Sequence, residues 1–361
     1  MNAKNSNDNF NWDEEFSLLN LEETVLLIGH NFYPSIHKDL NERLSKDLHK
    51  KLTAFYDRDG LFLFEDSSSK TRAQSVSAQF YKNLTPNQDI LNKIIELPFP
   101  LIISANPDHF LLDSFKNANF KHQFDYYFSN NASKKHEIKL EEPTAENPIL
   151  FNLFGSIEQP ASLILDYDDL FKLFKNLFSD SNLPDKVKVF LSRIKTYIFI
   201  GFHFERWYTQ MFIRYINMHE DHYGNQNQNY VLKTILPDNK YSLFFKEQFK
   251  LRFIAADLQF LDHLHTYYLN RKELRKPLQI EQSSEAKRIN DWIGENEFDK
   301  AIRMLDMVLE DDSDKSILLQ IKGKYTKYKM DESLGDVAKR EDLNIELGQI
   351  RRSLQLLTKI L

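Results

Sequence analysis

The sequence predicts an α/β fold, with a doubly wound and mostly parallel sheet followed by a small all-α domain. Short apolar segments alternate with segments of helical spacing along most of the chain. The apolar segments are continuous, as parallel strands buried on both faces require. Strand signals end near Leu274, and only helical spacing follows.

Composition limits the chemistry that this chain can perform. It has 361 residues, 42% of them hydrophobic, which is enough for one large domain and one small one. It contains no cysteine, which excludes disulfides, thiolate zinc sites and a thiol nucleophile. The 11 histidines form no HExxH pair, so we expect no metal.

Charge and hydropathy also bear on partners. The net charge of -6 gives no reason to expect nucleic acid, and the apolar runs are too short to span a membrane. The polar N-terminus is not a secretory signal, so we expect a cytoplasmic protein.

The first predicted strand is Thr24–Ile28, within ETVLLIGHNFY, and it ends at Gly29. After Pro34, residues 35–56 have helical spacing, with leucine or isoleucine at four-residue intervals from Ile36 to Leu48. A strand, a glycine and then a helix is how Rossmann-like nucleotide-binding domains begin.

The next predicted elements surround a second buried strand. The polar stretch 65–79 passes into a helix, and FPLIISANPD supplies the strand. A helix follows over 108–119, and HQFDYYFSN is a third strand. Residues 135–148 are polar and bounded by proline, which indicates a loop.

The remaining strands repeat the same scheme. ILFNLFGSI and SLILDY supply two strands, and acidic residues including Asp166 begin the helix that follows them. KTYIFIGFHF is a strand that ends at Gly201 before an amphipathic helix, and LRFIAADLQF begins one more strand and helix. We therefore divide the chain into a tail (1–23), a nucleotide-binding domain (24–273), a linker (274–284) and a helical association domain (285–361).

Polar residues and glycines lie where the predicted strands end. In a doubly wound sheet the ligand crevice lies beyond the carboxyl ends of the strands. Four such tips matter here, and they are Gly29–Tyr33, Ala105–His109, Phe154–Ile157 and Gly201–Glu205. Asn106 and Asp108 can face this crevice or simply cap the next helix. His203, beside Glu205 and Arg206, can be a crevice residue or a surface ion-pair member.

These tips, in this order, resemble the sirtuin-like (SIR2-like) superfamily, specifically its branch in bacterial antiphage defence. The family's Asn–hydrophobic–Asp signature is matched by Asn106-Pro107-Asp108. Its later motifs are matched by NLFGSIEQPASLILDYDDL and FIGFHFERW. The resemblance covers Thr24 to Leu269.

The C-terminal sequence resembles the effector-associated domains of bacterial conflict systems. The matching stretches are INDWIGENEFDKAIRMLDMVL and LNIELGQIRRSLQLL. Such domains recruit a partner that carries a like domain, so the resemblance implies another defence protein as partner. The apolar helix faces can equally serve internal packing, and a homo-oligomer is left open.

The resemblance implies cleavage of NAD between ribose and nicotinamide, without a metal. It implies catalytic roles for Asn106, Asp108 and His109. Residues that would bind NAD or a related nucleotide are Gly29, His30, Asn31, Phe154, Gly155, Gly201 and His203.

The sequence also departs from the family pattern. Phe154 occupies the position of the family's general-base histidine, His203 replaces a serine, and the glycine-rich turn keeps only Gly29. Two interpretations therefore stay open. In one, a partner or assembly activates an NAD hydrolase in which His109, His30 or His203 takes the proton. In the other, the domain is a catalytically inactive adaptor or nucleotide sensor. Protein deacylation is disfavoured because the Cys₄ zinc module of true sirtuins cannot form.

Overall fold

The computed structural model of the chain divides into two compact units, Met1–Leu278 and Gln279–Leu361, which are described separately below. The structure describes residues 12–33, 36–130, 139–179, 183–218, 229–232, 239–254, 257–278, 284–309, 311–333 and 340–358. Most of the predicted N-terminal tail, part of the predicted loop at 135–148 and part of the predicted linker lie outside these residues.

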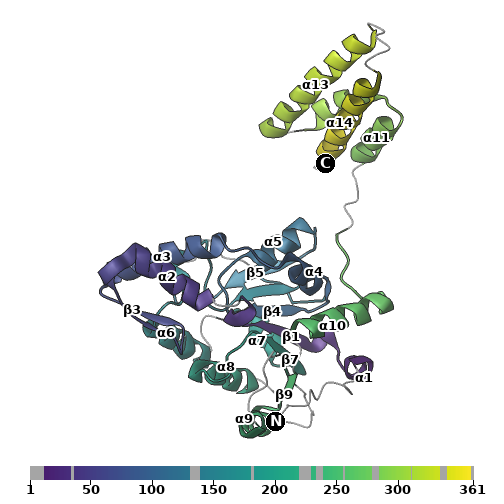
Figure 1. Ribbon diagram of the computed structural model, residues 1–361. Coiled ribbons are helices and arrows are strands. Elements are labelled where there is room, and N and C mark those ends of the chain that lie inside the picture. The colour runs from purple at the N-terminus through teal and green to yellow at the C-terminus, as the bar shows by residue number, and fades with distance from the viewer. Residues whose placement is uncertain are drawn as a thin grey trace, which may run out of the picture. The chain divides into compact units, whose positions relative to one another are not determined.

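A parallel sheet forms the centre of the first unit, which confirms the predicted fold class (Figure 1). Its strand order is β5-β6-β4-β1-β7-β8-β9, and every neighbouring pair is parallel. The strands are β1 (Thr24–Ile28), β4 (Leu101–Ser104), β5 (Gln123–Tyr126), β6 (Ile149–Asn152), β7 (Thr196–Ile200), β8 (Asn229–Leu232) and β9 (Leu251–Ile254).

The strand order changes direction at β1. After β1 the chain builds β4, β5 and β6 on one side of it, then returns to place β7 on the other side. The loops that follow β1 and β7 therefore diverge at their shared edge, and this is where doubly wound sheets open a ligand crevice.

Helices cover both faces of this sheet. The helices of the first unit are α1 (Trp12–Ser17), α2 (Ile36–Leu48), α3 (Ser67–Lys82), α4 (Gln88–Glu96), α5 (Phe110–Asn117), α6 (Tyr167–Phe178), α7 (Asp185–Leu191), α8 (Trp207–Met218), α9 (Asn239–Phe249) and α10 (Asp257–Arg271). One apolar core contains side chains of α6, α7, α8 and α9, and the other contains side chains of α1, α4, α5 and α10.

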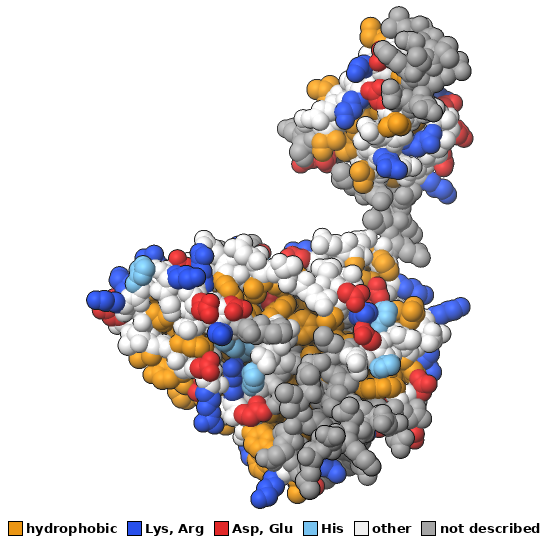
Figure 2. Space-filling model, viewed as in Figure 1, with side chains coloured by type: hydrophobic (Ala, Val, Ile, Leu, Met, Phe, Trp, Pro, Cys, Tyr) orange, Lys and Arg blue, Asp and Glu red, His pale blue; other side chains and the backbone are white. Residues whose placement is uncertain are grey.

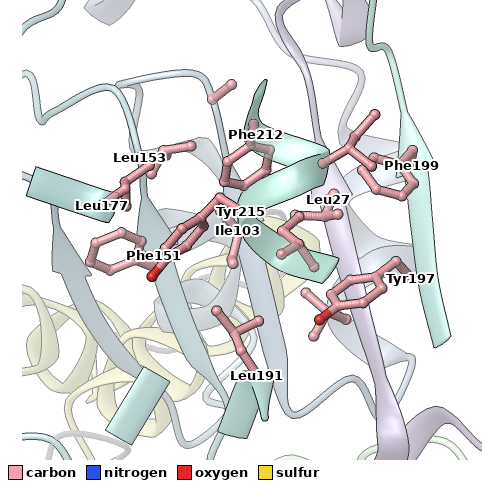
Figure 3. Close-up of a cluster of buried hydrophobic side chains, with 14 of the residues drawn as sticks. Leu27, Ile103, Phe151, Leu153, Leu177, Leu191, Tyr197, Phe199, Phe212 and Tyr215 are labelled. Atoms are coloured by element: carbon pink, nitrogen blue, oxygen red, sulfur yellow. The ribbon is translucent and has the colours of Figure 1, made fainter. Parts of the chain in front are cut away.

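Alternate residues of each central strand enter the two cores. Val25 and Leu27 of β1 belong to the first core, whereas Leu26 and Ile28 belong to the second. Figure 3 shows Leu27 in the first core, among side chains from other strands and helices. This two-sided burial is why the strand sequences are continuously apolar.

Two predicted elements were wrong. The helix predicted to run to residue 56 ends at Leu48, and β2 (Leu52–Tyr56) pairs antiparallel with β3 (Leu61–Phe64). The predicted strand at SLILDY is not a strand. It begins at the end of a 3-10 turn, and the one backbone hydrogen bond that joins its described residues to the hairpin runs from Phe62 N to the Leu165 carbonyl. Both segments pack in a third apolar cluster with α2 and α3.

Other elements gave no usable sequence signal. The four-residue strand β8 and the short helices α1 and α7 were not predicted. The predicted helix start at Asp166 is confirmed, since its carboxylate accepts the backbone N–H of Asp169 at 2.9 Å.

The second unit is entirely helical in its described residues. It contains α11 (Ser284–Gly294), α12 (Phe298–Val308), α13 (Asp312–Ser333) and α14 (Arg340–Thr358). These helices surround a core of their own, in which Ile293, Leu305 and Leu354 are fully buried. Large hydrophobic side chains also remain exposed between charged ones on this unit, among them Met307, Leu319, Met330 and Ile345 (Figure 2). None of the described helices in either unit combines the length and apolar composition needed to cross a bilayer.

Arg275 lies in the segment that the sequence assigned to the linker, and it is buried against the first unit. It is 6% exposed, and its guanidinium donates hydrogen bonds to the carbonyls of Ile95, Phe99 and Ala145. The last described turn of this unit is thereby attached to the end of α4 and to the loop before β6.

We expect Arg275→Ala to lower the free energy of unfolding by about 2–4 kcal/mol, because three carbonyls lose their donors and the aliphatic stem leaves a gap. Urea denaturation measures the change. Arg271→Ala is the matched control, since Arg271 is exposed, with contacts to Glu273 and the Tyr267 ring, and it should cost less than about 1 kcal/mol. Equal effects of the two substitutions would show that the buried hydrogen bonds contribute nothing.

Candidate functional site

Four strand tips meet at the carboxyl edge of the sheet, as the sequence predicted. Gly29 N donates to the Ile200 carbonyl at 2.7 Å, which continues the pairing of β1 with β7 past the strand ends. Ala105 N donates to Ile28 and Leu153 N to Ser104, each at 2.7 Å, so β4 and β6 are joined in the same way. The tips after β1, β4, β6 and β7 therefore form one continuous edge.

Two glycines allow the tips of β1 and β7 to touch. A Cβ atom on Gly29 would lie 2.4 Å from the Gly201 carbonyl oxygen, and one on Gly201 would lie 2.4 Å from Phe32 N. Gly201 also has φ +71°, a conformation that side chains rarely adopt. Asn31, itself exposed, donates its backbone N–H to Gly201 across this contact at 2.9 Å.

Asn106 is buried at the centre of the edge. Its side-chain nitrogen donates to the Gly29 carbonyl at 3.1 Å, and its Oδ1 lies 3.3 Å from His30 Nδ1. Because a carbonyl can only accept, the amide NH₂ must face Gly29, which leaves Oδ1 to accept from His30. The neutral imidazole of His30 then carries its proton on Nδ1 and its lone pair on Nε2.

His30 packs against two other rings, those of Phe154 and His37. Its ring is 4.7 Å from the ring of Phe154 and 4.7 Å from that of His37, in edge-to-face geometry. Burial lowers the pKa of His30 well below its usual value, and the nearby His37 and Arg206 lower it further. Burial likewise lowers the pKa of His37 to about 3. Both imidazoles are therefore neutral at pH 7.

The turn after β6 is held in a conformation that favours glycine. Gly155 has φ +93°, and a Cβ there would lie 2.3 Å from the Ser162 carbonyl oxygen. This turn carries the Phe154 ring toward His30 on one side and Tyr208 on the other.

Asp108 hydrogen-bonds to residues other than Asn106 and His30. Its Oδ1 accepts from Phe110 N at 3.0 Å and from the Tyr33 hydroxyl at 3.5 Å, and its Oδ2 is buried without a hydrogen bond among the described residues. It lines a separate small cavity with Ser104 and Asn152. Burial raises the pKa of its carboxyl to about 6.

His109 also faces other partners. Its Nε2 lies 2.8 Å from Ser156 Oγ, and its Nδ1 lies 3.7 Å from the Glu158 carboxylate. His109 thus links the tip of β4 to the turn after β6. His203 lies at the crevice rim, with about a third of its side chain exposed and its Nδ1 3.9 Å from the Glu205 carboxylate.

Side chains nearly fill the crevice. Two cavities of about 20 Å³ each lie there, and both are lined by His30, Phe154 and Tyr208. These three side chains form what we call the shared wall. Ligand pockets commonly hold about 300–1,000 Å³, so this conformation does not admit a dinucleotide.

Sequence reasoning missed several residues of this site. His37 comes from α2 and Tyr208 from α8. Arg206 directly precedes α8, and its Nη1 forms hydrogen bonds with His37 Nε2 and the Tyr208 hydroxyl. Tyr208 in turn donates to the backbone carbonyl of Asp59, beside the β2–β3 hairpin, at 3.0 Å. Only Arg206 gave a sequence signal, as a neighbour of His203 at the tip of β7.

No group of metal-ligating side chains occurs among the residues that the structure describes.

Comparisons with known proteins found two matches to domain-family models. Residues 100–254 match the SIR2-like domain, and residues 284–361 match effector-associated domain 11. A search of curated proteins gave no match. The SIR2-like segment includes the tips of β4, β6 and β7, whereas Gly29 and His30 at the tip of β1 precede it.

We expect Gly201→Ala to destabilise the first unit by at least about 2 kcal/mol, because the left-handed conformation is strained by a Cβ and Phe32 N must move. Urea unfolding of the full chain measures the loss. Gly323→Ala, in α13 with open space around it, serves as control and should stabilise its helix by about 1 kcal/mol. A Gly201→Ala variant as stable as the unsubstituted chain would contradict the contact.

We expect Asp108→Asn to change how stability depends on pH. The folded carboxyl has a pKa of about 6, against 3.8 unfolded, so between these values the folded state binds more protons and stability falls as pH rises. From pH 4 to pH 7 the unsubstituted chain should therefore lose about 2 kcal/mol relative to Asp108→Asn. Urea denaturation at several pH values tests this, with the exposed Asp113→Asn as control. Parallel pH profiles for Asp108→Asn and the unsubstituted chain would refute it.

Proposed function

Because the chain contains a SIR2-like domain and an effector-associated domain, we propose that it is a bacterial defence effector that hydrolyses NAD when a partner recruits and activates it. SIR2-like domains are NAD-related, and an effector-associated domain implies a partner protein. Antiphage defence is the setting that the sequence resemblance implies.

One observation carries the catalytic part of this proposal, namely the position of His30. The family's histidine is replaced by Phe154, but the imidazole of His30 contacts that phenyl ring from the tip of β1. Its bond to Asn106 leaves the lone pair on Nε2, and its lowered pKa keeps the imidazole neutral, though it also makes it a weaker base than an exposed histidine. His30 can therefore supply the general base that Phe154 cannot.

The proposed reaction is hydrolysis of the bond between ribose and nicotinamide. A water oxygen bonds to the anomeric carbon, the carbon–nitrogen bond breaks, and its electron pair leaves with neutral nicotinamide. His30 Nε2 accepts the proton of the water, and the product is ADP-ribose. Asn106, held by Gly29, orients His30. Asp108 and His109 keep a supporting role in this proposal, as residues that hold the tips of β4 and β6.

Activation is needed because the crevice is closed. NAD can enter only if the shared wall of His30, Phe154 and Tyr208 moves. We assign that movement to assembly with a partner, which the second unit would contact through its exposed hydrophobic side chains such as Met307 and Leu319.

The small size of the cavities also favours a second candidate. A crevice that stays closed in every assembly would make the chain a catalytically inactive adaptor or nucleotide sensor. Its second unit would then recruit another defence protein without NAD turnover. The two candidates differ in whether nicotinamide is released.

The discriminating experiment incubates the full chain with NAD, alone and with the products of neighbouring genes, and measures free nicotinamide. We expect release in an assembled state. His30→Gln should reduce the rate about 10²–10⁴-fold, as loss of a general base does, and Asn106→Ala should reduce it as well.

His49→Asn is the matched control, because His49 is exposed and has a positive φ that asparagine tolerates. It should leave the rate unchanged. Release that survives His30→Gln would reject His30 as the base, and absence of release in all assemblies would favour the adaptor.

A further inference from the structure

Arg206 is a buried cation in the crevice that pairs with no described carboxylate. It is only 7% exposed, and its Nη1 contacts two neutral groups, the Tyr208 hydroxyl at 2.6 Å and His37 Nε2 at 3.2 Å. Within the described part of the chain, no residue accepts a hydrogen bond from its Nε or Nη2. One edge of the guanidinium, which carries two parallel donors, is therefore unused.

The groups around Arg206 do not compensate its charge. Its charge lowers the pKa of His30 and of His37, after the larger effect of burial, so both imidazoles stay neutral. A buried charge without a partner is costly, and the usual remedy is an oppositely charged group. Among the described residues, no carboxylate forms a salt bridge with Arg206, and the carboxylate of Asp59, which lines the neighbouring cavity, accepts from the Tyr167 hydroxyl instead.

The position of Arg206 suits an anionic ligand. It lines one of the two crevice cavities together with Gly201 and His203, at the carboxyl end of β7. It also directly precedes α8, a helix of 12 residues whose N-terminal end carries partial positive charge. The guanidinium, the helix end and the change in strand order thus coincide.

We propose that the Nε–Nη2 edge of Arg206 binds a phosphate group, either free or carried by a nucleotide. Phosphate oxygens accept two parallel hydrogen bonds from a guanidinium, in the geometry that this edge offers. The phosphate enters when the shared wall moves, because the cavity beside Arg206 measures about 20 Å³. The inference depends on the crevice and not on NAD hydrolysis.

The test titrates the full chain, alone and together with the products of neighbouring genes, with pyrophosphate, ADP-ribose and adenosine at constant ionic strength, and follows Tm and heat of binding. We expect pyrophosphate, ADP-ribose or both to raise Tm, and adenosine to have no effect. Binding of pyrophosphate indicates a site for free phosphate, whereas binding of ADP-ribose alone indicates phosphate carried by a nucleotide. Nicotinamide release is not measured, so the result stands apart from the hydrolysis proposal.

Arg206→Met, of similar length and uncharged, should weaken this binding at least tenfold while leaving the unliganded Tm unchanged or higher. Arg206→Lys keeps the charge but loses the two-donor edge, so it should weaken binding several-fold in a folded protein. Arg214→Met, on the exposed side of α8, is the matched control and should bind as before. The proposal is overturned if no phosphate compound binds either to the chain alone or to its assemblies, or if Arg206→Met and Arg206→Lys both bind as tightly as the unsubstituted chain.

Discussion

The backbone contact between Gly29 and Gly201 is the constraint on which the candidate site depends. A Cβ atom on Gly29 would collide with the Gly201 carbonyl, and one on Gly201 would collide with the backbone of Asn31 and Phe32. With both side chains absent, β1 and β7 continue their hydrogen bonding past the strand ends. The loop after β1 is thereby held over the end of β7, and His30 is directed toward Asn106 and Phe154. The crevice follows from this single close approach at the change in strand order.

The crevice differs from the two sheet cores in the polar side chains that line it. The cores are apolar, whereas the crevice adds His30, His37 and Arg206 to apolar side chains such as Phe154. Burying such groups is costly, and apolar side chains of similar volume would give a more stable closed fold. The crevice nevertheless keeps a guanidinium and two neutral imidazoles. This is explained if the crevice has two states, of which the closed one is described here. In the other state these groups meet solvent or a ligand.

The two units each bury an apolar cluster of their own, so their roles can differ. The first unit carries the strand tips and the buried polar groups, and the second carries a helical bundle with hydrophobic side chains still exposed. A bundle of this kind can contact another helical surface without disturbing its own core. In the function proposed above, recruitment and chemistry would therefore be carried by different units of one chain.

The sequence by itself determined the fold class, because strands buried on both faces must be continuously apolar, as Thr24–Ile28 and Thr196–Ile200 are. It also predicted that the four strand tips share one edge, since parallel strands end on the same side of a sheet. Only the tertiary structure decided which neighbours of Asn106 face the crevice, because beyond a strand end the direction of each side chain depends on its local turn. Asp108 and His109 consequently turn to Tyr33 and Ser156. His37 and Arg206 lie 169 positions apart and meet only because α2 and the segment before α8 cross the same edge, a contact that no local spacing encodes.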